Sequence, residues 1–516
     1  MIKEEQLELA DIQGAIIPGF RKDHSAIIAV RIQDVASCKK WLAKRASEVA
    51  RGDEVLAFNR LYKSIRKRRG SEALAPHALW MSMSFSFDGL KLLRGEEIAP
   101  DAFDPAFVRG MFQSNVGDAS PSRWVIGGST ETVPHILIVV AADDSAQLAA
   151  EVKRLRATIV AANGVVILGQ PQQGATLDGD LRGHEHFGFK DGISQPAVRG
   201  TASNDPKDVI DERRLSPTDE LFDVFASPGR VLVWPGQFVI GYNRQDRLEL
   251  TKPRPPATPK LSWLRNGSYL VYRRLRQKPH VFWRFCTDSA KRLSKKTSKD
   301  ISAEHFATLL VGRWPSGAPL ARAPEADNPA VATDDDANND FLFSERTPLV
   351  KLADGKIAGG TLPVASADAN GLVCPFPAHI RKTNPRDDPS DTSGPRDTKT
   401  RLMLRRGIPY GPTKAAPRSL EDDGADRGLL FMAYQASIEN QFEFVTKTWV
   451  NQENAPHDSD PATGQDPIIG QSSSPRFIRC ALVDEKIQLP APWIVTTGGG
   501  YFFTPSISAI SNKLSV

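Results

Sequence analysis

The strongest constraint on the fold is a rhythm of strand-like and helix-like segments that runs through both halves of the chain. Strand-like segments combine β-branched residues with alternation, and the stretches between them have helical periodicity. In the first half the predicted strands are 26–32, 77–87, 135–141 and 165–169, and the predicted helices are 37–49 and 145–163. In the second half the predicted strands are 237–242, 268–275, 428–436 and 500–504, and the predicted helices are 278–296, 303–311 and 438–450. Strands that alternate with helices in this way predict α+β units.

Length and repetition together indicate two such units. A chain of 516 residues exceeds what one hydrophobic core supports. The second half repeats the order of strands and helices in the first, so we expect a duplicated unit, with one domain over 1–225 and another over 226–516. Stretches 251–259, 321–339, 384–400 and 451–465 have the composition of loops.

The charge balance argues against a nucleic-acid partner. The formal net charge of +5 comes from 66 basic and 61 acidic residues, and 40% of the residues are hydrophobic. A basic run at 63–69 could be a polyanion patch, but no aromatic residues are interleaved with it, which favours a solvated helix face.

The cysteines and the N-terminus indicate the cellular setting that we expect for such a chain. Cys38, Cys286, Cys374 and Cys480 are scattered without metal-ligand spacing. The start of the chain is polar, and no apolar run is long enough to span a bilayer. We therefore expect a reducing, cytoplasmic setting and no membrane partner.

The segment 186–196 is the first that could carry chemistry. Gly188 and Gly192 flank Asp191, and glycines allow both unusual backbone conformations and close approach of a flat ligand. Asp191 could then accept a proton, or it could simply cap amides in a turn. His184 and His186 form a His-x-His pair without an evident third ligand, which favours polar packing.

Two later segments place a histidine and several cations near apolar residues. His379 follows the Pro-rich stretch 374–378 and could bind a metal through a neutral imidazole, or be a buried histidine bonded to the backbone. In segment 401–411 the arginines Arg401, Arg405 and Arg406 surround Leu-Met-Leu, which places a permanent cation near a buried surface or in solvent.

Taken together, these segments resemble the dye-decolourising peroxidase family, in its larger cytoplasmic bacterial and fungal-like branch. Gly188–Gly192 is similar to the family's GxxDG signature, His379 to its proximal haem ligand, and Arg405 to its distal arginine. Further matches occur in the same order as in the family, at 11–14, 311–320, 434–442 and 501–506. The resemblance thus covers nearly the whole chain.

The resemblance implies two ferredoxin-like units with one haem b in the C-terminal unit. It implies that His379 binds the iron and that Asp466 accepts the other imidazole N–H. Asp191 would transfer a proton of hydrogen peroxide and Arg405 would stabilise the developing charge. Because an aspartate replaces the usual peroxidase histidine, we expect more activity at acid pH.

Other residues have roles that the resemblance only suggests. Phe189 and Gly192 would contact the haem, and Arg381, Lys382 and Arg386 are candidate partners for its propionates. Tyr410 and Trp449 are candidate surface radical sites for bulky aromatic reductants, with core packing as the alternative. A homo-oligomer remains open.

Two departures from the family pattern matter. His379 and Arg405 are 26 residues apart, which is longer than in compact members and leaves Arg401 and Arg406 as alternatives to Arg405. Gly498–Gly500 stands where an acidic residue is more usual. The alternative functions are a haem-binding or iron-extracting protein with incidental turnover, and a haem-free interaction module.

Overall fold

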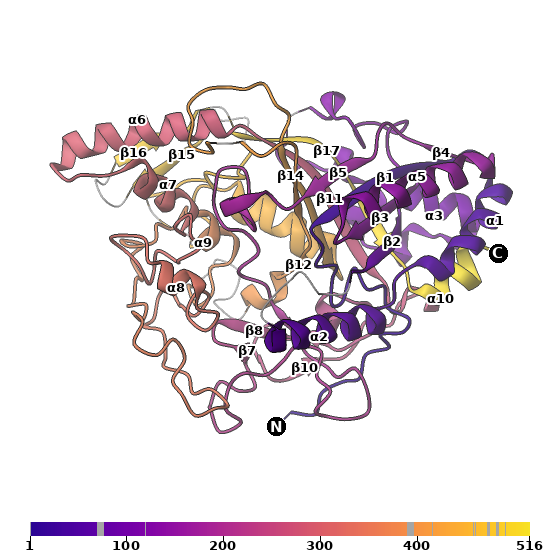
Figure 1. The fold of residues 1–516 in the computed structure, drawn as a ribbon, viewed down its shortest axis with the longest axis horizontal. Coiled ribbons are helices and arrows are strands. Elements are labelled where there is room, and N and C mark those ends of the chain that lie inside the picture. The colour runs from indigo at the N-terminus through magenta and orange to yellow at the C-terminus, as the bar shows by residue number, and fades with distance from the viewer. Residues whose placement is uncertain are drawn as a thin grey trace.

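A computed structural model of the chain describes residues 2–69, 77–118, 120–389, 397–414, 416–457, 459, 461–471, 475–480, 485–490 and 492–516. Its centre is a ten-stranded sheet in which the main path runs β12-β14-β11-β17-β2-β3-β1-β4. Every pairing within this sheet is antiparallel. Both halves of the chain therefore contribute to one continuous sheet (Figure 1).

The first unit supplies one end of that sheet. Its elements in chain order are β1 (His24–Ile32), α1 (Val35–Arg45), β2 (Leu79–Phe85), β3 (Ile136–Ala142), α5 (Ser145–Ala162) and β4 (Val165–Ile167). The spatial order of the strands is β4-β1-β3-β2, so the fourth strand lies beside the first. With one helix after β1 and one after β3, this is a ferredoxin-like arrangement.

The second unit repeats the same order and joins the first edge to edge. It contains β11 (Ser268–Gln277), α6 (Pro279–Thr297), β12 (Leu404–Arg405), β14 (Gly428–Gln435), the π-helical turns η10 (Ile438–Glu443) and η11 (Val445–Val450), and β17 (Ile494–Thr504). Its strands lie in the order β17-β11-β14-β12, and Phe503 of β17 pairs with Phe85 of β2. The predicted fold of two ferredoxin-like units is confirmed, while the boundary between 225 and 226 stays a prediction.

The remaining elements connect or cover these units. The helices are α2 (Gly52–Arg69), α3 (Phe87–Arg94), α4 (Pro105–Arg109), α7 (Ala303–Val311), α8 (Pro329–Thr333), α9 (His379–Thr383) and α10 (Ile507–Ala509). The strands are β5 (Gln172–Ala175), β6 (Ala197–Val198), β7 (Phe225–Ser227), β8 (Arg230–Val233), β9 (Arg244–Gln245), β10 (Pro253–Arg254), β13 (Ile408–Tyr410), β15 (Phe477–Cys480) and β16 (Glu485–Gln488).

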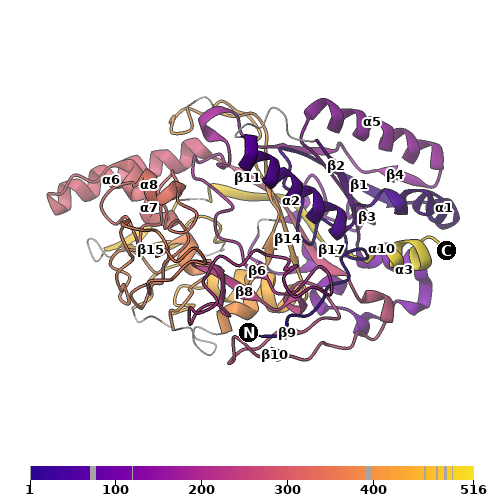
Figure 2. The same ribbon diagram turned by 60° about the horizontal axis from the view of Figure 1, so that its bottom comes forward.

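The sheet is buried on both faces, which explains its apolar strands. In β1, Ile28 packs with α1, α3 and α5, whereas its neighbour Ile27 packs with the N-terminal segment 7–17 and α2. Figure 2 shows α5 and α2 on opposite sides of these strands. Successive side chains point to opposite faces of a strand, so a strand covered on both sides has apolar residues at successive positions.

The two ends of the sheet approach each other. Strand β5 pairs with β1, and β13 pairs with β14. A Cβ added to Gly174 in β5 would lie 2.5 Å from Ile408 Cγ2 in β13. Glycine at this position therefore lets the two edge strands come close, and the sheet curls around the residues between them.

Several local predictions need correction. The predicted strand 237–242 is wrong: the 3-10 turn Pro235–Gln237 ends at the first residue of this segment, and Gly241 has a φ of +96°. A proline and a left-handed glycine both break a strand ladder. Helix 438–450 exists but has π-type turns. The basic run 63–69 lies on α2, where Lys63 is exposed and pairs with Glu212.

Two further observations concern the described residues only. Among them, no helix combines the length and apolar character that a membrane span requires. Cys38, Cys286 and Cys374 are free and buried. Residues 390–396 of the predicted loop 384–400 lie outside the described residues.

Candidate functional site

A cavity of about 400 Å³ lies between the second unit and the segment that precedes it. Its lining includes the turn 185–196, residues around β12, the helix that begins at His379 and the π-helical turns near Val445, together with residues of β11, β14 and β17. Most of these side chains are apolar, and a few charged groups converge among them. A volume of this size and this mixed lining are typical of a cofactor or small-molecule site.

His379 presents one ring nitrogen to this cavity and binds a carboxylate with the other. It is the first residue of α9, and Nδ1 lies 2.8 Å from Oδ2 of Asp466. The His379 side chain is 30% exposed, whereas that of Asp466 is 0% exposed. Asp466 Oδ1 accepts the backbone N–H groups of Ile468 and Ile469 at 2.8 and 2.9 Å, which fixes the carboxylate in place.

The charge of Asp466 changes the chemistry of this imidazole. Burial alone lowers the pKa of His379, but the charge and hydrogen bond of Asp466 outweigh burial and raise it. With Nδ1 engaged as a donor to Asp466, Nε2 is the nitrogen left to bind a ligand in the cavity. A histidine held this way, with a carboxylate behind it, is a common arrangement for a metal ligand.

Asp191 reaches the cavity from a turn built on two left-handed glycines. Gly188 has a φ of +93° and Gly192 one of +75°, conformations that other residues rarely adopt. The Asp191 N–H donates to Gly183 O at 2.9 Å, and Asp191 Oδ1 accepts the Gly192 N–H at 2.6 Å. The amide-capping alternative thus describes a real contact, yet Asp191 also stands exposed at the lining of the cavity.

The side chain of Glu185 stabilises the same turn through hydrogen bonds to its backbone. Its carboxylate accepts the backbone N–H groups of Phe187 and Phe189, both at 2.9 Å, and the side-chain amide of Gln277. Burial raises the pKa of Glu185 to about 7, even though these hydrogen bonds favour the charged form. Glu185 is not among the residues predicted from the sequence, because an acidic residue beside two histidines has no distinguishing pattern.

Arg405 is positioned by the same motif that carries Asp191. Its guanidinium donates to Ser194 O, and the side chain of Gln195 bonds the Arg405 backbone at both N–H (3.2 Å) and C=O (3.3 Å). Burial lowers the pKa of Arg405, and the nearby Asp191 carboxylate offsets part of that effect. Asp191 also raises the pKa of His379 and Arg405 lowers it, so the three side chains interact electrostatically.

Strand register separates the three candidate arginines. Leu404 pairs with Tyr434 and Arg405 with Ala433, and Ile408 pairs with Leu430 in the same register. Successive side chains alternate, so Arg405 faces the cavity and Arg406 faces the opposite side of the strand. Arg401 lines the cavity too, but its guanidinium is bound to Asp397 at 3.0 Å.

Two buried cations in the lining lack a carboxylate partner at ion-pair distance within the described residues. Arg386 donates to Asn339 and Phe341, and Arg313 donates to Gly317 O, Asn338 O and Asn339 Oδ1. Burial and the charge of Arg386 lower the pKa of Arg313 to about 9, and burial lowers that of Arg386 to about 10. Buried charge without a partner is costly, so this pair favours an anionic ligand.

Arg386 is a candidate from the sequence, whereas Arg313 is not. Arg313 lies in the matched segment 311–320, between Gly312 and Trp314. An arginine in such an apolar stretch could have indicated a buried cation. The sequence does not indicate which cavity its side chain reaches.

Arg381 and Lys382 point elsewhere. Arg381 is fully buried and donates to Asp388, at 2.7 and 2.9 Å, and to Asp368 at 3.0 Å. The Lys382 ammonium donates to the carbonyls of Gln452, Ala455 and Gly464. Neither belongs to the lining, so their contacts stabilise the segments around α9.

The aromatic and histidine candidates are mostly buried. Phe189 lines the cavity and stacks on Trp283, and Gly192 lines it as well. Tyr410 and Trp449 are 5% and 0% exposed, so the structure does not place either ring at the surface. His186 Nε2 lies 2.8 Å from Tyr410 O, and His184 Nδ1 lies 3.2 Å from Arg182 O. No metal-binding group of three ligands is found among the described residues.

Two family models match the chain. The model described as the DyP dimeric alpha+beta barrel domain matches residues 11–175, and the model described as Dyp-type peroxidase, C-terminal, matches residues 350–459. The second match contains His379 and Arg405. The turn 185–196 and Arg313 lie between the two matched segments.

Similar proteins cover nearly the full chain. Dye-decolorizing peroxidase msp1 of Mycetinis scorodonius is 33% identical over 99% of this chain and 88% of its own length. Dye-decolorizing peroxidase AauDyP1 of Auricularia auricula-judae is 31% identical over 99% of this chain and 87% of its own length. An ancestral D-type dye decolorizing peroxidase has a similar solved structure, with a TM-score of 0.77, 30% identity and coverage of 99% of this chain and 100% of that chain.

Proposed function

Because the chain belongs to the dye-decolorizing peroxidase family, we propose that it binds one haem b in the cavity, reduces hydrogen peroxide there and oxidises bulky aromatic compounds such as dyes or phenolics. In this proposal His379 is the iron ligand, Asp191 transfers the proton and Arg405 stabilises charge. The observation that carries the assignment is the convergence of His379, backed by Asp466, with Asp191 and Arg405 on one cavity.

The residues that line the cavity fit haem. Its apolar walls suit a porphyrin, and His379 offers Nε2 because Nδ1 is bound to Asp466. Arg313 and Arg386 supply buried positive charge for carboxylates, with Arg386 3.6 Å from the centre of the Phe341 ring. We therefore assign the propionates to Arg313 and Arg386, and not to Arg381, whose guanidinium is already paired with Asp368 and Asp388.

The reaction divides between the cofactor and the chain. When bound, haem supplies the iron at which peroxide is reduced and through which electrons arrive from an organic reductant. Asp191 takes the proton from one peroxide oxygen and delivers it to the other, so that water can leave. Arg405 places positive charge where negative charge accumulates as the O–O bond breaks.

Protein groups behind these side chains keep them oriented. The Gln195 amide and Ser194 carbonyl hold Arg405, while Glu185 and the glycine turn hold the backbone that precedes Asp191. Asp466 keeps the His379 ring in one tautomer and increases its electron donation. An aspartate as proton carrier favours acid pH, so a pH–rate optimum well above neutrality would contradict the role of Asp191.

Peroxide-dependent oxidation of a dye tests the proposal directly. We expect Asp191→Ala and Arg405→Leu each to retain haem and to lose at least about 100-fold in kcat/KM for peroxide. Asp180→Ala, at an exposed aspartate outside the cavity lining, is the matched control and should behave as wild type. Negligible turnover by the wild-type holoprotein, or iron release that leaves the porphyrin intact, would instead favour a haem-binding or iron-extracting protein.

A further inference from the structure

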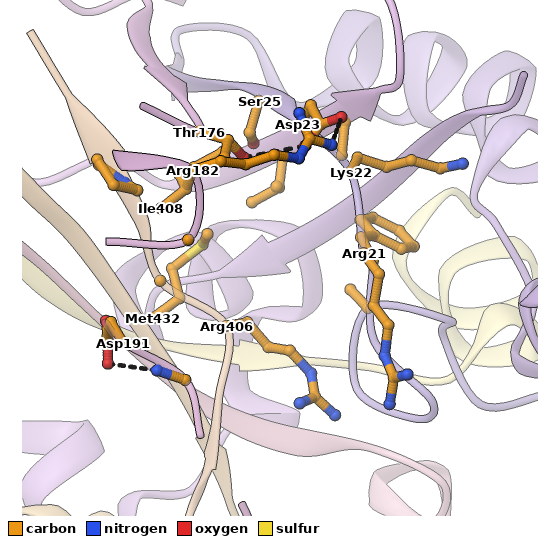
Figure 3. A pocket seen from close by; sticks show the side chains of 18 of the residues that line it. Arg21, Lys22, Asp23, Ser25, Thr176, Arg182, Asp191, Arg406, Ile408 and Met432 are labelled. Atoms are coloured by element: carbon orange, nitrogen blue, oxygen red, sulfur yellow. Dashed lines mark hydrogen bonds and ion pairs between the residues drawn. The ribbon is translucent and has the colours of Figure 1, made fainter. Parts of the chain in front are cut away.

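A second pocket opens beside Asp191, on the other side of the turn 185–196, which we call the distal turn (Figure 3). We call it the vestibule; its volume is about 790 Å³. It shares Lys190, Asp191, Gly192 and Gly407 with the haem cavity, so the two spaces meet at the distal turn. The alternation that sends Arg405 into the cavity sends Arg406 into the vestibule.

Positive charge dominates the lining of the vestibule. The cationic side chains are Arg21, Lys22, Arg66, Arg182, Lys190 and Arg406, and the carboxylates are Asp23 and Asp191. Lys22 is paired with Asp143 at 2.6 Å and Arg182 with Asp23 at 2.7 Å. A cleft lined by an excess of one sign concentrates its field and attracts the opposite charge.

Arg21 and Arg406 are the cations with the clearest capacity for a ligand. Arg406 donates to the carbonyls of Ile16 and Pro18, both at 3.0 Å, and neither arginine forms an ion pair with any described carboxylate. Their guanidinium ends lie side by side in Figure 3. Burial and the like charge of Arg21 lower the pKa of Arg406 to about 10. An anion between these groups would relieve that repulsion.

Apolar side chains also line the vestibule. Ile408 and Pro409 come from β13, and Met432 comes from β14. A flat hydrocarbon group could lie against these side chains while a carboxylate binds the guanidinium groups, whose planar donors suit a carboxylate. A simple inorganic anion would leave these apolar side chains unused.

We propose that the vestibule binds a small aromatic carboxylate, with its carboxylate on Arg21 and Arg406 and its ring against Ile408, Pro409 and Met432. This inference rests on the proposed peroxidase function, since it makes the vestibule the place where an anionic reductant waits beside the distal turn. It adds to that function a second place at which negative charge on a reductant is favoured.

Equilibrium dialysis of the holoprotein with benzoate and with uncharged benzamide tests the binding site. We expect benzoate to bind at least about tenfold more tightly than benzamide, because charged hydrogen bonds are the stronger ones. Arg21→Gln should weaken benzoate binding about two- to fivefold, as expected for an exposed charge, and added salt should weaken it further. Lys91→Gln, at an exposed lysine on α3 outside both pockets, is the control and should leave binding unchanged.

Three results would overturn the proposal. They are equal affinity for benzoate and benzamide, no response to Arg21→Gln, and a change in the haem spectrum that follows benzoate occupancy, which would place benzoate on the iron. Peroxide-dependent oxidation of 4-hydroxybenzoate and 4-hydroxybenzamide distinguishes failure of the vestibule proposal from failure of the proposed peroxidase function. Selective benzoate binding without peroxide-dependent oxidation of either phenol would refute the peroxidase function alone. Oxidation of both phenols with equal KM would refute the vestibule alone.

Discussion

The two faces of the edge segment from Leu404 to Tyr410, which contains β12 and β13, border two pockets of different construction. On one face, Arg405 enters a cavity where a histidine–carboxylate pair and a distal aspartate surround mainly apolar walls. On the other face, Arg406 enters a vestibule with a cationic rim. Adjacent arginines with the same chemistry thus meet different surroundings, because the strand turns them to opposite sides. We infer that these surroundings decide which arginine acts on peroxide and which binds an anionic substrate.

The largest expected effect comes from exchanging the two arginines for glutamine one at a time. Arg405→Gln should lower kcat/KM for peroxide by about 10²–10³, the usual loss when a charge-stabilising donor is removed. Arg406→Gln should instead raise KM for an anionic phenol more than KM for its neutral amide. Steady-state kinetics with both phenols checks this. A larger loss of peroxide reduction in Arg406→Gln than in Arg405→Gln would reverse the assignment.

The next effect concerns Glu185, the buried carboxylate behind the distal turn. Its pKa of about 7 exceeds the ordinary value of 4.5, so the folded protein binds a proton there that the unfolded chain releases. The resulting stabilisation is complete below pH about 4.5 and is lost as pH rises through about 7, a change of up to about 3 kcal/mol in the free energy of unfolding.

Urea unfolding at pH 5 and pH 8 measures this difference. Glu185→Gln should lose less stability than wild type between the two pH values, because the glutamine cannot ionise. Glu96→Gln, at an exposed carboxylate, should follow wild type. A Glu185→Gln profile parallel to that of wild type would mean that Glu185 stays ionised in the folded protein.

The smallest of these effects concerns Arg313. Replacement by methionine removes a buried cation whose contacts are to carbonyl and amide oxygens. We expect Arg313→Met to weaken haem binding about tenfold, the scale of one charged hydrogen bond, while the haem-free protein becomes no less stable. Haem titration and thermal unfolding measure the two quantities. Unchanged haem affinity would remove Arg313 from the propionate site.

Much of the architecture could be predicted from sequence, because alternation and helical periodicity are local. Strands 26–32 and 135–141 and helix 303–311 lie where the pattern indicates. Strand 237–242 failed because its apolar residues suggested a ladder, whereas Pro235 and Gly241 impose a turn. The order of the motifs, through the family resemblance, also predicted that His379, Asp191 and Asp466 belong to one site.

What could not be predicted depends on long-range pairing. The choice between Arg405 and Arg406 requires the register of β12 against β14, and no local pattern records it. Arg381 looked like an anion ligand in sequence, but Asp368 and Asp388 fold back onto it. Glu185 and Arg313 acquire their roles from the groups that surround them in the fold, and a single charged residue leaves no periodic signal in the sequence.

The central claim is that His379 holds a haem whose other face meets Asp191 and Arg405. The Soret absorbance of protein expressed with sufficient haem, recorded for wild type, His379→Ala and the control His280→Ala, tests it most directly. The account predicts a haem spectrum in wild type and His280→Ala, and in His379→Ala a lost or shifted band that added imidazole restores. An unchanged spectrum in His379→Ala, or no haem in wild type, would contradict it.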